Sequence, residues 1–167
     1  MAERSRRIGK GLQGSAAVGA VAAMLALAPG CGGNGGPEPA PAACLTTSST
    51  YLKALDRAPG RVTVPPNVRI SECVVPGQSG GELANVGSEL IVAATRLAST
   101  VPEGGAVGEQ AALRLGYLVG AVRRGAEETS GIHSDLVRRL EATARLTSES
   151  ADAAAFAEGL RAGLARG

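Results

Sequence analysis

One stretch of the chain, Gly108–Gly125, constrains the fold more than any other because it predicts a helix with two different faces. Apolar side chains recur there at intervals of three and four residues and form one face of an α-helix. Small residues recur at every fourth position and form a second, smooth face that lets another helix approach closely. The two sets are Leu115, Leu118, Val119 and Val122, and Gly108, Ala112, Gly116 and Gly120. Such a helix needs neighbours on both sides, so we expect it at the centre of a helical bundle.

The composition also favours helices. Aromatic residues make up 2% of the 167 residues, whereas hydrophobic residues, mostly Ala, Leu and Val, make up 44%. A core of small aliphatic side chains suits close-packed helices better than a β-sandwich. The length suggests a single domain. We therefore expect an all-α fold, a small helical bundle of about four main helices with an irregular N-terminal segment.

Hydrophobic periodicity and capping residues predict where the helices lie. A short helix is expected at Thr46–Ala58, capped by Ser48 or Ser49. The longer helices are expected at Glu82–Ser99, at about Val107–Thr129, at about Asp135–Arg145 after a Ser134 cap, and at Ala151–Ala165 after a Ser150 cap. Short connections imply that neighbouring helices run antiparallel. Gly159 and Gly163 are expected to weaken the last helix, and Gly131 to cap the end of the central one.

The segment between the short helix and the first long one is less regular. Val62 and Val64 alternate with polar residues, as do Val68 and Ile70, and Pro65-Pro66-Asn67 lies between them. This pattern is compatible with a small irregular hairpin or with extended chain laid across the helices. We favour extended chain.

The first 30 residues read as a signal peptide. Four basic residues precede Ser15–Ala28, an apolar run of 14 residues that is shorter than the roughly 20 needed to span a bilayer. An uncleaved membrane anchor is the alternative. The segment Ser5–Lys10 also looks like part of a twin-arginine signal, although we favour an ordinary basic n-region, and the export route stays open.

The residues that follow, Leu27-Ala28-Pro29-Gly30-Cys31, resemble the lipobox of bacterial lipoproteins. The resemblance implies cleavage before Cys31, which would become the diacylated N-terminus and anchor the protein on the outer face of a bacterial membrane. The alternative is cleavage after Ala28, which would release a soluble secreted protein. The resemblance covers only about the first 31 residues.

If Cys31 carries lipid, Cys44 and Cys73 are left to pair as a disulfide, because the chain has three cysteines. Such a bond would stabilise the fold by about 3–4 kcal/mol. Two free buried thiols are the alternative. Residues 32–43 are nearly all Gly, Pro and Ala, so residues 31–43 are expected to be a lipidated Cys followed by a disordered tether, and residues 44–167 the helical domain.

Little in the chain indicates chemistry. His133 is the only histidine, and it is expected to face solvent or to cap a helix; the functional reading is a base oriented by a carboxylate such as Asp135. Two cysteines and one distant histidine are too few for a metal site, and no cofactor motif occurs. Neighbouring charges are expected to pair along helix faces, Asp135 with Arg139, Glu141 with Arg145, and Arg123 and Arg124 with Glu127 and Glu128.

The charge balance bears on partners. Four of the 17 basic and one of the 15 acidic side chains lie in the first 30 residues, which leaves 13 and 14 in the rest of the chain. A near-neutral domain with interspersed signs is not expected to bind nucleic acid. We therefore expect an exported, lipid-anchored, non-enzymatic binding or scaffold module that presents a helical surface to another envelope protein. The alternative is a small envelope hydrolase that uses His133 with a carboxylate.

Overall fold

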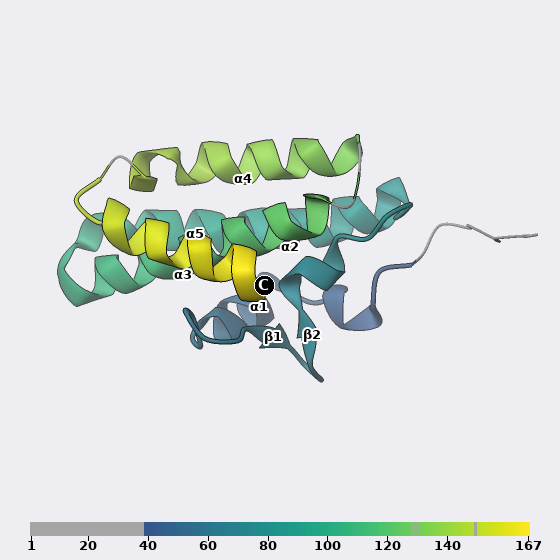
Figure 1. Cartoon of the computed structure of the whole chain (residues 1–167), viewed down its shortest axis with the longest axis horizontal. Coiled ribbons are helices and arrows are strands. Elements are labelled where there is room, and N and C mark those ends of the chain that lie inside the picture. Colours follow the sequence, from purple (N-terminus) through teal and green to yellow (C-terminus); the bar gives the residue numbers. More distant parts are fainter. Residues whose placement is uncertain (1–38, 128, 130, 149) are drawn as a thin grey trace, which may run out of the picture. The chain divides into compact units, whose positions relative to one another are not determined.

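The structure is a computed structural model that describes residues 39–127, 129, 131–148 and 150–167. Within these residues the chain forms five α-helices and a pair of two-residue strands (Figure 1). In chain order the elements are η1 (Ala42–Cys44), α1 (Ser48–Leu55), β1 (Thr63–Val64), β2 (Val68–Arg69), η2 (Ile70–Cys73), α2 (Gly80–Thr100), η3 (Val101–Glu103), α3 (Gly105–Glu127), α4 (Ile132–Ser148) and α5 (Ala153–Arg166). The predicted all-α fold with four main helices is confirmed.

The central position of α3 is also confirmed, because α3 contacts each of the other three long helices. Its apolar face is closed off from solvent, and Leu115, Leu118 and Val122 have no exposed surface. Tyr117 is equally buried, and its hydroxyl oxygen accepts a hydrogen bond of 3.3 Å from the Val62 amide. The central helix therefore holds both the other helices and the irregular N-terminal segment.

The four long helices form two parallel pairs. Helices that follow each other in sequence run antiparallel, as the short connections predict, so α2 and α4 run in one direction and α3 and α5 in the other (Figure 1). The most extensive contact between two helices joins α3 and α5, which are not consecutive. The expectation of antiparallel neighbours thus describes the connections but not the closest pair.

Glycines make the close approach of α3 and α5 possible. Gly116 and Gly120 of α3 lie against the backbone of α5, and Gly159 and Gly163 of α5 lie against the backbone of α3. At each of the four positions a Cβ atom would come closer than 3.0 Å to a backbone oxygen of the other helix. The expectation that Gly159 and Gly163 simply weaken the last helix is therefore wrong. These glycines pack against the smooth stripe of α3 and allow the two backbones to come close.

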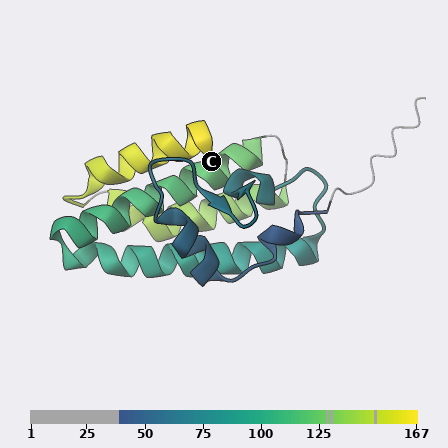
Figure 2. The same ribbon diagram turned by 90° about the horizontal axis from the view of Figure 1, so that it is seen from below.

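A disulfide between Cys44 and Cys73 ties the N-terminal segment, as the cysteine count predicts. Both cysteines are fully buried, and the Tyr51 hydroxyl donates a hydrogen bond of 2.8 Å to the Cys44 carbonyl. The segment lies across one side of the long helices (Figure 2). Glu89 of α2 helps to hold it there by accepting a hydrogen bond of 2.6 Å from the Ser48 amide.

The structure corrects two predictions in this segment. The chain around Pro65-Pro66-Asn67 is a hairpin, with Thr63 opposite Arg69 and Val64 opposite Val68, and not the extended chain that we favoured. Antiparallel pairing satisfies backbone groups that extended chain would leave without partners. The predicted tether is also too long, because Ala40 is 7% exposed and η1 begins at Ala42. The folded domain therefore starts before Cys44.

Most predicted helices are recovered, but several caps differ. A capping box begins α2 early, because the Ser79 hydroxyl accepts from the Glu82 amide at 3.2 Å while the Glu82 carboxylate accepts from the Ser79 amide at 3.3 Å. The N-cap of α1 is Thr47 and not Ser48 or Ser49, and the N-cap of α5 is Asp152 and not Ser150. Ser134, the predicted cap of α4, lies inside that helix. Gly131, with φ of 80°, lies just before α4.

Candidate binding groove

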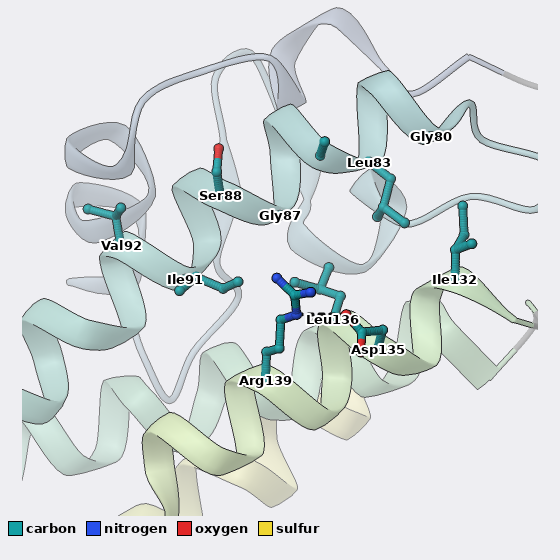
Figure 3. Close-up of a pocket in the computed structure, with 11 residues that line it drawn as sticks. Gly80, Leu83, Gly87, Ser88, Ile91, Val92, Ile132, Asp135, Leu136 and Arg139 are labelled. Carbon is teal, nitrogen blue, oxygen red and sulfur yellow. Dashed lines mark ion pairs between the residues drawn. The ribbon is translucent and has the colours of Figure 1, made fainter.

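A groove of about 610 Å³ lies between α2 and α4 (Figure 3). Most of the side chains that line it are apolar or small. They are Gly80, Leu83, Ala84, Gly87, Ser88, Ile91 and Val92 from α2, and Ile132, Asp135, Leu136 and Arg139 from α4. Val92 is 40% exposed and Ile132 is 50% exposed. The groove is thus an apolar surface that the described part of the chain leaves open to solvent.

A stripe of small residues follows the outer edge of this groove on α2. Gly80, Ala84 and Ser88 are spaced four residues apart, and all three are exposed. A Cβ atom at Gly80 would meet nothing within 4 Å. Gly87, by contrast, is buried and faces α4, because a Cβ atom there would lie 3.3 Å from a Leu136 methyl group. The stripe is therefore open to solvent, whereas Gly87 belongs to the contact between α2 and α4.

Charged groups lie on one lip of the groove. Asp135 of α4 accepts a hydrogen bond from Arg138 and forms an ion pair of 2.6 Å with Arg139, as predicted for Asp135 and Arg139. The hydrogen bond from Arg138 and the charge of Arg139 hold the pKa of Asp135 below its ordinary value. The side chains of Arg138 and Arg139 are 80% and 67% exposed. Two cations therefore share one carboxylate, and the lip carries an excess positive charge.

A second hollow, of about 400 Å³, lies farther along the same two helices. Ala98 of α2 and Thr143, Leu146 and Thr147 of α4 contribute to it. Leu146 is 80% exposed, so this hollow also presents apolar surface to solvent. The seam between α2 and α4 is therefore hollowed near both ends.

His133 is buried, although an exposed or capping position was expected from the sequence. It is 3% exposed, so the expectation of a solvent-facing or capping histidine is wrong. Its Nε2 atom lies 3.2 Å from the Gln78 side-chain oxygen, and the Gln78 amide nitrogen donates to the Cys73 carbonyl at 3.3 Å. Since the amide oxygen can only accept, the proton resides on Nε2 and Nδ1 is bare.

The surroundings of His133 favour its neutral form. Burial lowers the pKa of His133 below its ordinary value. Nδ1 is buried and has no hydrogen-bond partner in the described part of the chain, so a second proton there would be unpaired. The structure gives His133 an amide as partner in place of the carboxylate that an acid–base pair would use, and Asp135 is engaged by two arginines.

The remaining candidate residues fall outside the groove. Arg123 pairs with Glu141 at 3.6 Å, so Glu141 reaches across to α3, and Arg124 donates to the Leu164 and Ala165 carbonyls of α5. Both arginines thus make contacts between helices, and their expected pairing with Glu128 lies outside the described residues. Glu128 and Cys31 lie outside the described residues. Among the residues that the structure describes, no group of three or more potential metal ligands occurs.

The sequence reasoning did not find the groove, although two signals pointed to it. The small residues at positions 80, 84 and 88 have the same spacing as the stripe on the central helix, and Val92 continues that line. The second signal is Ile132, an apolar residue that precedes the helix predicted at about Asp135–Arg145. Neither signal shows by itself which other helix lies opposite.

Comparison with protein-family models, with curated proteins and with solved structures finds no match to this chain in any of the three. In the described part of the chain, none of the helices has the length and apolar character needed to cross a membrane.

Proposed function

We propose that this chain is a non-enzymatic binding module of a bacterial cell envelope, and that the groove between α2 and α4 receives an apolar surface of another envelope protein. The observation that supports the proposal is the groove itself. Val92 and Ile132 keep much of their surface exposed on opposite sides of it. Exposed apolar surface that is gathered in one hollow is typical of interaction sites.

The location is part of the same proposal. The lipobox-like segment that ends at Cys31 supports export and lipid anchoring on the outer face of a bacterial membrane. A soluble secreted protein is the alternative. Intact mass spectrometry of the protein from its own host tests this directly. A mature chain that starts at a diacylated Cys31 supports the anchor, whereas an unmodified chain that starts at Pro29 contradicts it.

Site-specific photocrosslinking in the host tests the groove. A photoreactive amino acid is placed at Val92 in the groove and, as a matched control, at Val107, which is 55% exposed on α3 and lies outside the groove lining. The proposal predicts a discrete crosslinked protein species from position 92 that is absent from position 107. Equal crosslinking from both positions, or none from position 92, would contradict a binding role for the groove.

A further inference from the structure

The groove has room for a helix beside α2, as a comparison of α2 with α3 indicates. On α3, Gly116 and Gly120 form a smooth stripe that is covered by α5. On α2, Gly80, Ala84 and Ser88 repeat this spacing, yet they line an open groove. From Gly80 to Val92 the groove extends about 18 Å along α2, which corresponds to about 12 residues of a helix lying beside it.

Apolar side chains of both helices line the groove beside this stripe. Leu83 and Ile91 of α2 are directed toward α4, whereas Ser88 and Val92 point to the outer side of α2 (Figure 3). Ile132 and Leu136 line the groove from α4. A helix with apolar residues at positions i, i+3 or i+4, and i+7 presents a continuous stripe that fits between two such rows. The second hollow, around Leu146, extends the same seam for a longer helix.

The charges favour an acidic occupant. Asp135 is shared between Arg138 and Arg139, whose side chains remain largely exposed at the lip, so an added carboxylate would find a donor there. The N-termini of α2 and α4 lie at the same end of the groove, because Gly80 and Ile132 both line it. The first turns of these helices also carry Glu82 and Asp135, whose carboxylates offset the helix dipoles at that end, so the exposed arginines supply the positive charge of the groove.

We infer that the occupant of the groove is an amphipathic α-helix of a partner protein, which lies along α2 and α4 and directs carboxylates toward Arg138 and Arg139. This inference rests on the proposed binding function and adds the chemistry of the partner. An acyl chain would use the apolar lining but not the smooth stripe. A second copy of this chain would have to bring arginines toward arginines if it met the groove face to face.

Selection from a library of random 14-residue peptides tests the inference. The mature full-length protein is held in lipid nanodiscs, and binders to empty nanodiscs are removed first. Enriched peptides are expected to share apolar residues at helical spacing and to carry Asp or Glu. Binding should fall at least tenfold in an Ala84→Trp variant, because the large side chain would occupy the groove from its α2 side. The neighbouring, exposed Asn85→Trp serves as the matched control.

Charge reversal supplies the second readout. In Arg138→Glu/Arg139→Glu, the acidic peptides should bind at least tenfold more weakly, and their Lys-substituted counterparts should bind more tightly. The control Arg96→Glu/Arg161→Glu changes the net charge equally at exposed positions outside the groove lining. It should leave binding unchanged.

The outcomes separate this inference from the proposed function. Crosslinking at Val92 together with peptides that lack helical spacing, or that ignore charge reversal, would overturn the helical, acidic partner but keep the binding role. An acyl molecule retained in native mass spectra, or a dimer in sedimentation that Ala84→Trp disrupts, would likewise overturn it. Absence of both crosslinking and enriched peptides would overturn the two together.

Discussion

The two parallel helix pairs of this bundle use the same kind of small-residue stripe with opposite results. Between α3 and α5 the stripes meet, and Gly116 and Gly120 lie against the backbone of the helix that carries Gly159 and Gly163. Between α2 and α4 only one helix is smooth. Leu136 of α4 meets α2 at Gly87, which lies beside the stripe, and the stripe of Gly80, Ala84 and Ser88 itself stays open. Two helices come into backbone contact only when both facing surfaces are small.

The comparison explains how a chain with so few aromatic residues builds a stable core and still exposes an apolar groove. The α3–α5 pair gains close packing and dispersion contacts over its whole length. The α2–α4 pair gains less, since long side chains hold the helices apart. The following predictions test this difference, from the largest expected effect on stability to the smallest.

A large side chain between α3 and α5 should cause the largest loss of stability. Gly159→Leu places a side chain where even a Cβ atom would overlap the Leu113 carbonyl oxygen, so we expect a loss of about 3–5 kcal/mol in the free energy of unfolding. Gly81→Leu is the control, because a Cβ atom there meets nothing within 4 Å. Chemical denaturation checks both variants. Equal losses would mean that the α3–α5 contact is looser than described.

Removal of the disulfide should cost slightly less. The bond closes a loop between residues separated by 29 positions, so Cys44→Ala/Cys73→Ala should lower the free energy of unfolding by about 3–4 kcal/mol. The N-terminal segment packs on α3 through η2, so its loosening should affect that side of the bundle first. Hydrogen exchange would show this as faster exchange in residues 44–73 than in α4; uniform acceleration would contradict it.

Acidification should destabilise the start of α4, where His133 is buried. His133 has a lowered pKa in the folded protein, so its contribution to stability is fully present above the unfolded pKa of about 6.5. This contribution is lost as pH falls below that value, because the unfolded chain then binds the proton more readily. The free energy of unfolding is measured from pH 7.5 to pH 5 for the native chain and for His133→Gln. As the pH falls, the native chain should lose more free energy of unfolding than His133→Gln does. An equal loss in the two proteins would contradict a buried, neutral His133.

Changes in the open groove should have the smallest effect on stability. Val92→Asp alters a side chain that is 40% exposed, so the free energy of unfolding should change by no more than about 0.5 kcal/mol. Binding of the selected acidic peptides should nevertheless fall at least tenfold, because the apolar lining gains a negative charge. Parallel denaturation and peptide titration would check both statements. A large loss of stability would show that Val92 supports the fold.

Part of the fold could be predicted from local patterns. Apolar residues at helical spacing located the four long helices, and the small stripe from Gly108 to Gly120 placed one of them at the centre. The cysteine count identified the Cys44–Cys73 pair. Each of these features depends on the spacing of a few residue types, which is a property of the chain itself.

Other features depend on residues far apart in sequence. Glycines in α5 weaken an isolated helix, and only the packing of α3 against them makes them favourable. The burial of His133 depends on Gln78, which lies 55 positions earlier in the chain.

Local patterns predict that the chain forms helices with apolar and smooth faces, because helical periodicity relates residues three and four positions apart. Which smooth face is covered and which stays open depends on the packing of helices that are distant in sequence. Gly116 and Gly120 of α3 lie against α5, whereas a Cβ atom at Gly80 of α2 would meet nothing within 4 Å and Leu136 of α4 packs beside that stripe, at Gly87. Side-chain size on a distant helix sets how closely two backbones approach, and no local pattern contains that information.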